Sequence, residues 1–197
     1  MVAELAEQKH ALRQRIAARR CAVAPAAVAR AGRAVADALL SCPVVREARS
    51  IGLYAALSDE LPSRPVFEAL VTQQRSLALP AAGPGRALVF RVAERWEALV
   101  RGRWGVLTPP LEAPEIVASR LDLVLLPGVA FDAEGNRLGR GGGHYDATFP
   151  PADAGPLLIG LAWSFQLVDA VPHDSRDRRV DAIVTEDGCV VKPGRQQ

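Results

Sequence analysis

Apolar positions along the chain follow two different periods, and each period predicts a different kind of element. In residues 3–20 the apolar side chains Leu5, Leu12 and Ile16 form one stripe, which predicts an amphipathic helix. A second helix is expected over residues 26–41, because Pro25 opens it and Pro43 lies just beyond its end. Shorter apolar runs predict the strands, at residues 50–56, 76–80, 87–93, 122–132, 157–163, 181–186 and 190–192.

The order of these elements predicts the fold class. A further helix is expected over residues 63–74 and residues 94–120 are mixed, so strands alternate with helices along much of the chain. This alternation is typical of an α/β fold with a largely parallel sheet. In such sheets ligands bind beyond the carboxyl ends of the strands. The pair Asp59-Glu60, a glycine-rich stretch after residue 132 and the segment after Trp163 all follow predicted strands, so we expect them to share one rim.

Length and cysteine content limit the possibilities. The chain has 197 residues, of which 49% are hydrophobic, which is enough for the core of one domain spanning residues 1–197. Its three cysteines lie far apart and form no Cys-x-x-Cys motif, so we expect neither a disulfide framework nor a zinc site. We therefore expect a reducing, cytoplasmic location. No signal peptide or membrane-spanning run is recognisable.

Positive charge is concentrated at the N-terminus. The net charge is only +2, but residues 1–33 carry seven basic and two acidic side chains. Such a segment is compatible with a nucleic-acid arm, a solvated helix face or part of an anion site. Lys9 and Arg13 lie one helical turn apart, so they share a face and could together hold a polyphosphate.

The glycine-rich stretch carries the strongest chemical signal. Gly135, Gly139, Gly141, Gly142 and Gly143 are interleaved with Arg137 and Arg140 and precede a helix expected from about Tyr145. Glycine permits positive φ and close approach of a ligand, and exposed N–H groups together with arginines favour an anion such as phosphate. The stretch has no Walker A ending, and His144 replaces the third glycine of a dinucleotide motif. A flexible connector is the alternative interpretation.

Carboxylates near this stretch suggest further ligands. Asp146 and Asp181 could hold Mg²⁺, which needs only one or two carboxylates when substrate phosphates supply the other oxygens. Asp59-Glu60 could accept hydrogen bonds from a heterocycle, or could simply precede a helix. Trp104 and Trp163 are of a type found more often in cores, although their faces would suit a flat heterocycle.

A longer motif resembles a known family. The sequence Pro-Gly-Val-Ala-Phe-Asp at 127–132, followed by Gly-Asn-Arg-Leu-Gly-Arg-Gly-Gly-Gly-His-Tyr-Asp at 135–146, closely resembles the signature of 5-formyltetrahydrofolate cyclo-ligases. The N-terminal Lys-x-x-Leu-Arg at 9–13, the pair Asp59-Glu60 and the segment 177–186 also match. The resemblance implies a three-layer α/β sandwich like those of sugar-phosphate isomerases and CoA transferases. It also implies ATP- and Mg²⁺-dependent closure of 5-formyltetrahydrofolate to 5,10-methenyltetrahydrofolate, with release of ADP and phosphate.

The same resemblance implies roles for individual residues. ATP would be bound by the N-terminal helical segment (residues 1–42) and the glycine-rich stretch, through Lys9, Arg13, Arg137, Leu138, Gly139, Arg140, Gly141, Gly142, Gly143, His144 and Tyr145. The folate would contact Ala55, Glu60, Trp104, Arg140, Gly141, Gly142, Gly143 and His144. Arg140 and Tyr145 would be catalytic, and Asp146 and Asp181 would bind the metal.

Two positions depart from the family pattern. Relatives often have Lys at position 142 and Tyr at position 144, where this chain has Gly142 and His144. Arg140 would then carry more of the positive charge at the phosphates. We expect lysine to be tolerated at position 142.

Two other functions remain open from the residues alone. One is a different ATP-using enzyme on the same scaffold, against which Glu60 argues. The other is a non-catalytic nucleotide- or RNA-binding module, against which the modest net charge argues. We expect a monomer that acts on small molecules, with no nucleic-acid or membrane partner.

Overall fold

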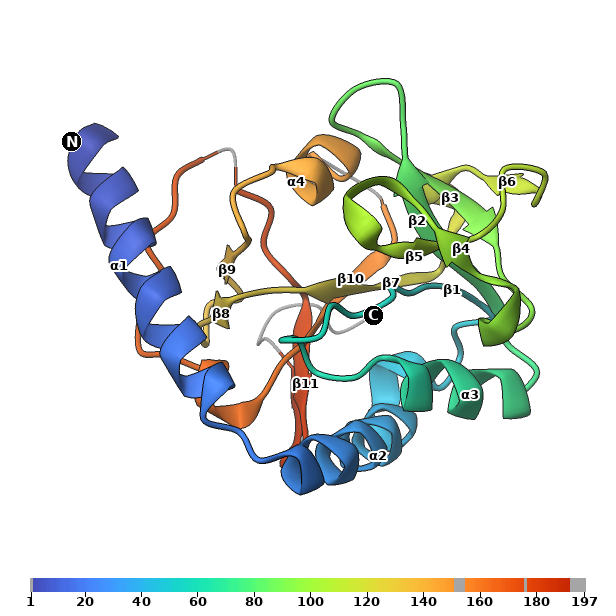
Figure 1. The fold of residues 1–197 in the computed structure, drawn as a ribbon, viewed down its shortest axis with the longest axis horizontal. Helices are drawn as coiled ribbons and strands as arrows, with labels where there is room; N and C mark the ends of the chain where they lie inside the picture. The colour runs from blue at the N-terminus through green and yellow to red at the C-terminus, as the bar shows by residue number, and fades with distance from the viewer. Residues whose placement is uncertain (1, 151–154, 176, 192–197) are drawn as a thin grey trace.

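The computed structural model describes residues 2–150, 155–175 and 177–191, and its centre is an eight-stranded sheet (Figure 1). The strands are ordered β12-β11-β10-β7-β1-β2-β3-β6 across this sheet. Their bounds are β1 Ser50–Gly52, β2 Ser76–Ala82, β3 Leu88–Val92, β6 Glu115–Ile116, β7 Leu123–Pro127, β10 Leu157–Leu161, β11 Ala182–Thr185 and β12 Gly188–Val191. The four α-helices described are α1 Val2–Cys21, α2 Pro25–Ser41, α3 Arg64–Thr72 and α4 His144–Thr148.

The middle of the sheet is parallel and its edges are antiparallel. Strands β11, β10, β7, β1 and β2 pair in parallel, whereas β12, β3 and β6 pair antiparallel to their neighbours. Leu123, Val124, Leu125 and Leu126 of β7 are all 0% exposed, because both faces of this central strand are covered. The predicted α/β class with a largely parallel sheet is confirmed.

Helices cover the sheet. In Figure 1, α2 and α3 lie together below the sheet, and their buried side chains Val35, Leu39, Val66 and Leu70 join one core with β1, β7 and β10. A second core on the other face contains Phe131 and Phe149. Helix α4 lies above the sheet in the same view.

Helix α1 runs along one side of the molecule in Figure 1. Two members of its predicted apolar stripe, Leu12 and Ile16, are buried against Val129, Leu138 and their neighbours, whereas Leu5 is only partly buried and lies outside this cluster. Helix α1 thereby packs on a hairpin formed by β8 (Ala130–Phe131) and β9 (Arg137–Leu138). This contact brings the basic face of α1 beside the glycine-rich stretch.

Several boundaries differ from those predicted. Strand β1 ends at Gly52 rather than at residue 56, and the run expected from residue 122 to 132 breaks into β7 and β8. The break lies at Gly128, where a Cβ atom would overlap the ring of Phe131. The mixed region 94–120 holds short 3₁₀ helices at Trp96–Ala98, Arg103–Gly105 and Ala118–Arg120 and a hairpin of β4 (Val100–Arg101) with β5 (Leu107–Thr108). Two more 3₁₀ turns lie at Pro43–Val45 and Ser164–Gln166.

The cysteine expectation is wrong in one respect. Cys42, at the end of α2, forms a disulfide with Cys189 in β12, although 147 positions separate them. Strand β12 returns antiparallel beside β11, and α2 packs on both strands, so the two cysteines meet. Cys21 is a free, exposed cysteine. Among the described helices, none combines the length and the hydrophobicity that a membrane span needs.

Candidate functional site

A cavity of about 490 Å³ opens at the carboxyl ends of β1 and β7. Tyr54 and Ala55, which follow β1, and Pro127 and Gly128, at the end of β7, form part of its lining. Pro80, Ala81 and Ala82 of the neighbouring strand β2 also line it, so the cavity lies where ligands bind in open parallel sheets. Its volume is in the range usual for a small-molecule site.

The glycine loop (residues 139–143) forms one side of this cavity between β9 and α4. Gly141 has φ +106° and Gly143 has φ +65°, values that residues with a Cβ adopt rarely. Backbone turns of this kind can direct successive N–H groups to one point and so favour an anion. The structure therefore gives the glycine loop the special backbone geometry that its sequence predicts.

Arg137 lies beneath the loop and organises the next two functional side chains. It is 7% exposed, its Nη2 donates to Asp146 Oδ1 at 2.9 Å, and its guanidinium lies 5.6 Å from the centre of the Tyr145 ring. Arg137 Nε is buried and has no partner among the described residues. Burial raises the pKa of Tyr145, so its phenol is protonated at neutral pH and can donate a hydrogen bond.

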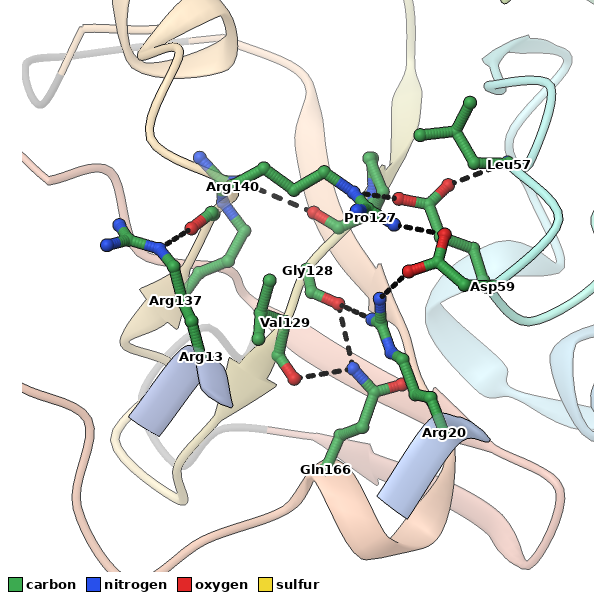
Figure 2. A network of polar contacts seen from close by, with 12 residues as sticks. Arg13, Arg20, Leu57, Asp59, Pro127, Gly128, Val129, Arg137, Arg140 and Gln166 are labelled. Carbon is green, nitrogen blue, oxygen red and sulfur yellow. Dashed lines mark hydrogen bonds and ion pairs between the residues drawn. The ribbon is translucent and has the colours of Figure 1, made fainter. Parts of the chain in front are cut away.

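Arg140 extends from the glycine loop to the acidic pair after β1. Its Nε donates to Glu60 Oε1 at 2.9 Å and its Nη2 to Asp59 Oδ1 at 2.6 Å; Figure 2 shows the Arg140 side chain reaching toward Asp59. Glu60 Oε2 also accepts a hydrogen bond from the Leu57 N–H at 3.0 Å. Burial alone would raise the pKa of the Asp59 carboxyl, but the hydrogen bond and charge of Arg140, together with Arg20, lower it.

Helix α1 reaches the cavity through the two basic residues singled out in the sequence. Arg13 lines the cavity and its Nε donates to the Gly139 carbonyl at 2.9 Å (Figure 2). Lys9 does not line the cavity. Its Nζ forms an ion pair at 2.6 Å with Asp177, and Asp177 does line the cavity. Arg13 therefore connects α1 to the glycine loop, and Lys9 connects it to another residue of the cavity lining.

His144 and Gly142 fit against each other beside the loop. A Cβ atom on Gly142 would lie 2.7 Å from His144 Cδ2. The same ring contacts the Arg86 carbonyl through Nδ1 at 2.8 Å, so it connects α4 with the turn between β2 and β3. The two positions at which the sequence analysis expects departures from the family pattern are therefore in close contact.

The structure brings most of the sequence-predicted site residues together. Those that line the cavity are Arg13, Ala55, Glu60, Arg137, Leu138, Gly139, Arg140, Gly141, Gly142, Gly143, His144, Tyr145 and Asp146. Asp181 does not line it; its Oδ2 accepts a hydrogen bond from the Leu158 N–H near the start of β10. Trp104 belongs to the 3₁₀ turn Arg103–Gly105, but its side chain lies outside the described part of the structure.

Other lining residues were missed by sequence reasoning. Tyr54 is 4% exposed, lies directly before Ala55, and has a pKa raised well above its ordinary value by burial and then by Glu60. Its place at the end of a buried strand was the available signal. Arg103 and Thr108 line the cavity from the β4–β5 region, where the sequence pattern was too mixed to place them.

The carboxylates at the site suit Mg²⁺ only when a bound ligand supplies further oxygen atoms. Within residues 2–150, 155–175 and 177–191, no three His, Cys, Asp or Glu side chains gather into a group that could hold a metal ion. Asp146 is nevertheless in the cavity lining, and its Oδ1 accepts hydrogen bonds from Arg137 Nη2 and the Arg178 N–H. One carboxylate is sufficient for Mg²⁺ when phosphates supply further oxygens.

Comparison with known proteins agrees with this geometry. Residues 5–186 match the model of the 5-formyltetrahydrofolate cyclo-ligase family. The 5-formyltetrahydrofolate cyclo-ligase of Escherichia coli strain K12 is 32% identical over 171 residues, which cover 85% of this chain and 94% of that protein. The solved structure of Aquifex aeolicus 5,10-methenyltetrahydrofolate synthetase superposes with a TM-score of 0.82 at 28% identity, covering 96% of this chain and 95% of that one. A Mycoplasma pneumoniae 5,10-methenyltetrahydrofolate synthetase, at 23% identity and a TM-score of 0.72, shares the fold.

The family match spans far more than half of the chain and includes every residue that lines the cavity. This chain belongs to the 5-formyltetrahydrofolate cyclo-ligase family.

Proposed function

We propose that the cavity carries out the ATP-dependent cyclisation of 5-formyltetrahydrofolate to 5,10-methenyltetrahydrofolate, with release of ADP and phosphate. Family membership gives this activity, and one observation supports its assignment to the cavity. Arg140 has its backbone in the glycine loop and its guanidinium on Glu60, so one residue joins the two regions proposed for ATP and folate.

The reaction requires activation of a poor electrophile. In the proposed first step the formyl oxygen attacks the γ-phosphorus of ATP, the bond to the β-phosphate oxygen breaks, and ADP leaves. In the second step N10 of the folate attacks the formyl carbon and loses its proton to water, the carbon–oxygen bond breaks, and phosphate leaves. Phosphoryl transfer depends mainly on positioning and charge neutralisation, so no protein nucleophile is required.

The residues of the chain fit these needs. The glycine loop, Arg13 and Arg137 would hold the phosphates, with Lys9 adding charge from α1, and Arg140 would balance the charge that develops on the transferred group. Tyr145 is protonated, so its role would be to donate a hydrogen bond rather than to act as a base.

The folate would occupy the side of the cavity that contains Glu60. A carboxylate accepts hydrogen bonds only, so Glu60 suits the donor groups of a reduced pterin. Ala55, the glycine loop and His144 also line the cavity and could contact the ring system, and Trp104 stays a prediction from the sequence.

Family membership implies ATP use, and we propose that Mg²⁺ accompanies the nucleotide. Asp146 would hold the ion together with the phosphate oxygens; when bound, Mg²⁺ would neutralise phosphate charge. Asp181 is a less suitable ligand because it is outside the cavity lining. A monomeric state and a single-domain organisation stay predictions from the sequence. The cytoplasmic location stays a prediction.

An absorbance assay for the methenyl product tests the proposal. We expect product from 5-formyltetrahydrofolate only when ATP and Mg²⁺ are both present. Arg140→Ala should lower kcat/KM by a factor corresponding to about 1.5–3 kcal/mol, the usual value of a charge-assisted hydrogen bond. Arg33→Ala, at an exposed position on α2, is the matched control and should behave as wild type. Unchanged kinetics in Arg140→Ala would remove Arg140 from the site.

A further inference from the structure

Arg20 is a buried arginine for which the proposed mechanism has no role. It lies one residue before the end of α1, is 8% exposed, and its Nε is buried without a partner among the described residues. Burial lowers the pKa of its guanidinium, while Glu60 and Asp59 oppose that change, and an arginine remains charged under all ordinary conditions. Burying a charge is costly, so its contacts require an explanation.

Both contacts of Arg20 lead to the cavity (Figure 2). Its Nη2 donates to the Gly128 carbonyl at 2.6 Å, and its Nη1 lies 3.5 Å from Asp59 Oδ2. Gly128 lines the cavity at the end of β7, and Asp59 holds Arg140 through its other oxygen. The Asp59 carboxylate is therefore shared between a buried arginine and an arginine of the glycine loop.

The two contacts also fix the relation between elements that are distant in the sequence. Gln166 Nε2 donates to the same Gly128 carbonyl at 2.8 Å and to the Val129 carbonyl at 2.6 Å, so the break after β7 is held from two sides. Arg20 connects this break to Asp59, whose side chain is 43% exposed. Among the ion pairs of the described residues, the other partner of Asp59 is Arg140.

We infer that Arg20 is a positioning residue of the substrate site, which acts through Asp59 on Arg140 and through the Gly128 carbonyl on the wall of the cavity. The inference rests on the proposed placement of ATP and folate in this cavity. Arg20 fixes one oxygen of Asp59, so the other oxygen presents a defined partner to Arg140. The guanidinium of Arg140 is thereby kept beside Glu60 instead of sampling many rotamers.

Three variants test this role. Arg20→Gln removes the charge, Arg20→Lys keeps it without the forked geometry, and Arg19→Gln changes the adjacent arginine, whose exposed contacts are with Phe165. We expect Arg20→Gln to lower kcat/KM about 10- to 100-fold at temperatures far below its Tm. Arg20→Lys should recover part of this loss, and Arg19→Gln should stay near wild type. A lower Tm with unchanged kcat and KM would show a purely structural role and overturn the inference.

Asp59→Asn tests the same connection from its more exposed end and is useful if Arg20→Gln does not fold. We expect a similar loss in kcat/KM, and the two changes together should cost less than the sum of the two single losses because both remove the Arg20–Asp59 contact. Normal kinetics in Asp59→Asn would overturn the route through Asp59. Glu60→Gln separates the two proposals: normal folate kinetics there would reject the proposed site. A loss in Glu60→Gln with wild-type kinetics in Arg20→Gln and Asp59→Asn would reject only the positioning role.

Discussion

Arg140 and Glu60 lie 80 positions apart in the sequence, yet their side chains form a hydrogen-bonded ion pair at 2.9 Å in the lining of the cavity. The pair joins the glycine loop to the segment after β1. Burial would lower the pKa of Arg140, but its hydrogen bonds to Asp59 and Glu60 raise it, so its guanidinium is charged at neutral pH. Any ligand that contacts Arg140 therefore meets a charged and already oriented partner.

Glu60→Gln should weaken folate binding selectively. The substitution keeps the shape but replaces one acceptor oxygen with a donor, which should cost about 1.5–3 kcal/mol if a charged hydrogen bond to the pterin is lost. We expect the KM for 5-formyltetrahydrofolate to rise while calorimetric ATP affinity stays near wild type. Glu68→Gln, an exposed change on α3, is the control. Normal folate kinetics would favour a different ATP-using enzyme on this scaffold.

Gly142→Ala should be destabilising because of His144 rather than because of the backbone. Gly142 is not among the glycines with positive φ, but a Cβ there would lie 2.7 Å from the His144 ring. We expect a loss of about 1–2 kcal/mol in the free energy of unfolding, measured by urea denaturation, and recovery of most of it in a His144→Ala background. Additive effects in this double-mutant cycle would contradict the coupling.

The same close approach revises the expectation for lysine at position 142. Lysine carries the same Cβ as alanine, so we expect Gly142→Lys to be well tolerated only when His144 is also changed. The comparison to make is the Tm of Gly142→Lys with that of Gly142→Lys/His144→Ala. An equal and wild-type Tm for both would show that the ring moves aside at no cost.

Asp122→Asn should lower the free energy of unfolding at neutral pH but not in strong acid. Asp122 Oδ2 accepts hydrogen bonds from the N–H groups of Ser50 and Arg49, and these bonds lower the pKa of its carboxyl. A lowered folded-state pKa gives stability that is present above the ordinary value of 3.8 and is lost as the pH falls through the folded-state pKa.

We therefore expect Asp122→Asn to cost about 0.5–1.5 kcal/mol at pH 7, a modest value because the site is exposed. The difference from wild type should vanish below the folded-state pKa. Urea denaturation across the acid range measures both. Asp37→Asn, at an exposed position on α2, is the control, and a difference that persists unchanged into strong acid would contradict the assignment.

The Cys42–Cys189 disulfide predicts which thiol reacts. Before reduction, alkylation followed by mass spectrometry should label Cys21 alone, and after reduction under denaturing conditions all three cysteines. Cys42→Ser should lower stability by about 2–4 kcal/mol under oxidising conditions, whereas Cys21→Ser should have little effect. Labelling of all three thiols without reductant would rule out the disulfide.

Local patterns in the sequence predicted the individual helices, strands and loops, because these depend on residues that are neighbours along the chain. The stripe of Leu12 and Ile16 specified α1, and the uninterrupted apolar run of β7 specified a central strand, because period and burial are properties of a short segment. The glycine-rich motif likewise predicted a loop with unusual backbone angles, as Gly141 and Gly143 have. The family resemblance came from the same stretch.

Only the tertiary structure decided which distant side chains meet. Asp59 and Arg140 are joined because β1 and β7 are neighbours in the sheet, and Arg20 reaches them because α1 packs on the β8–β9 hairpin. The order of strands also brings Cys189 to Cys42 and leaves Asp181 outside the cavity lining. The sequence gives the chemistry of each residue, whereas contacts between residues far apart in the sequence follow from the packing of the whole chain. The sequence by itself therefore determined the fold class, the glycine loop and the family, and the tertiary structure decided the partners of each charged group.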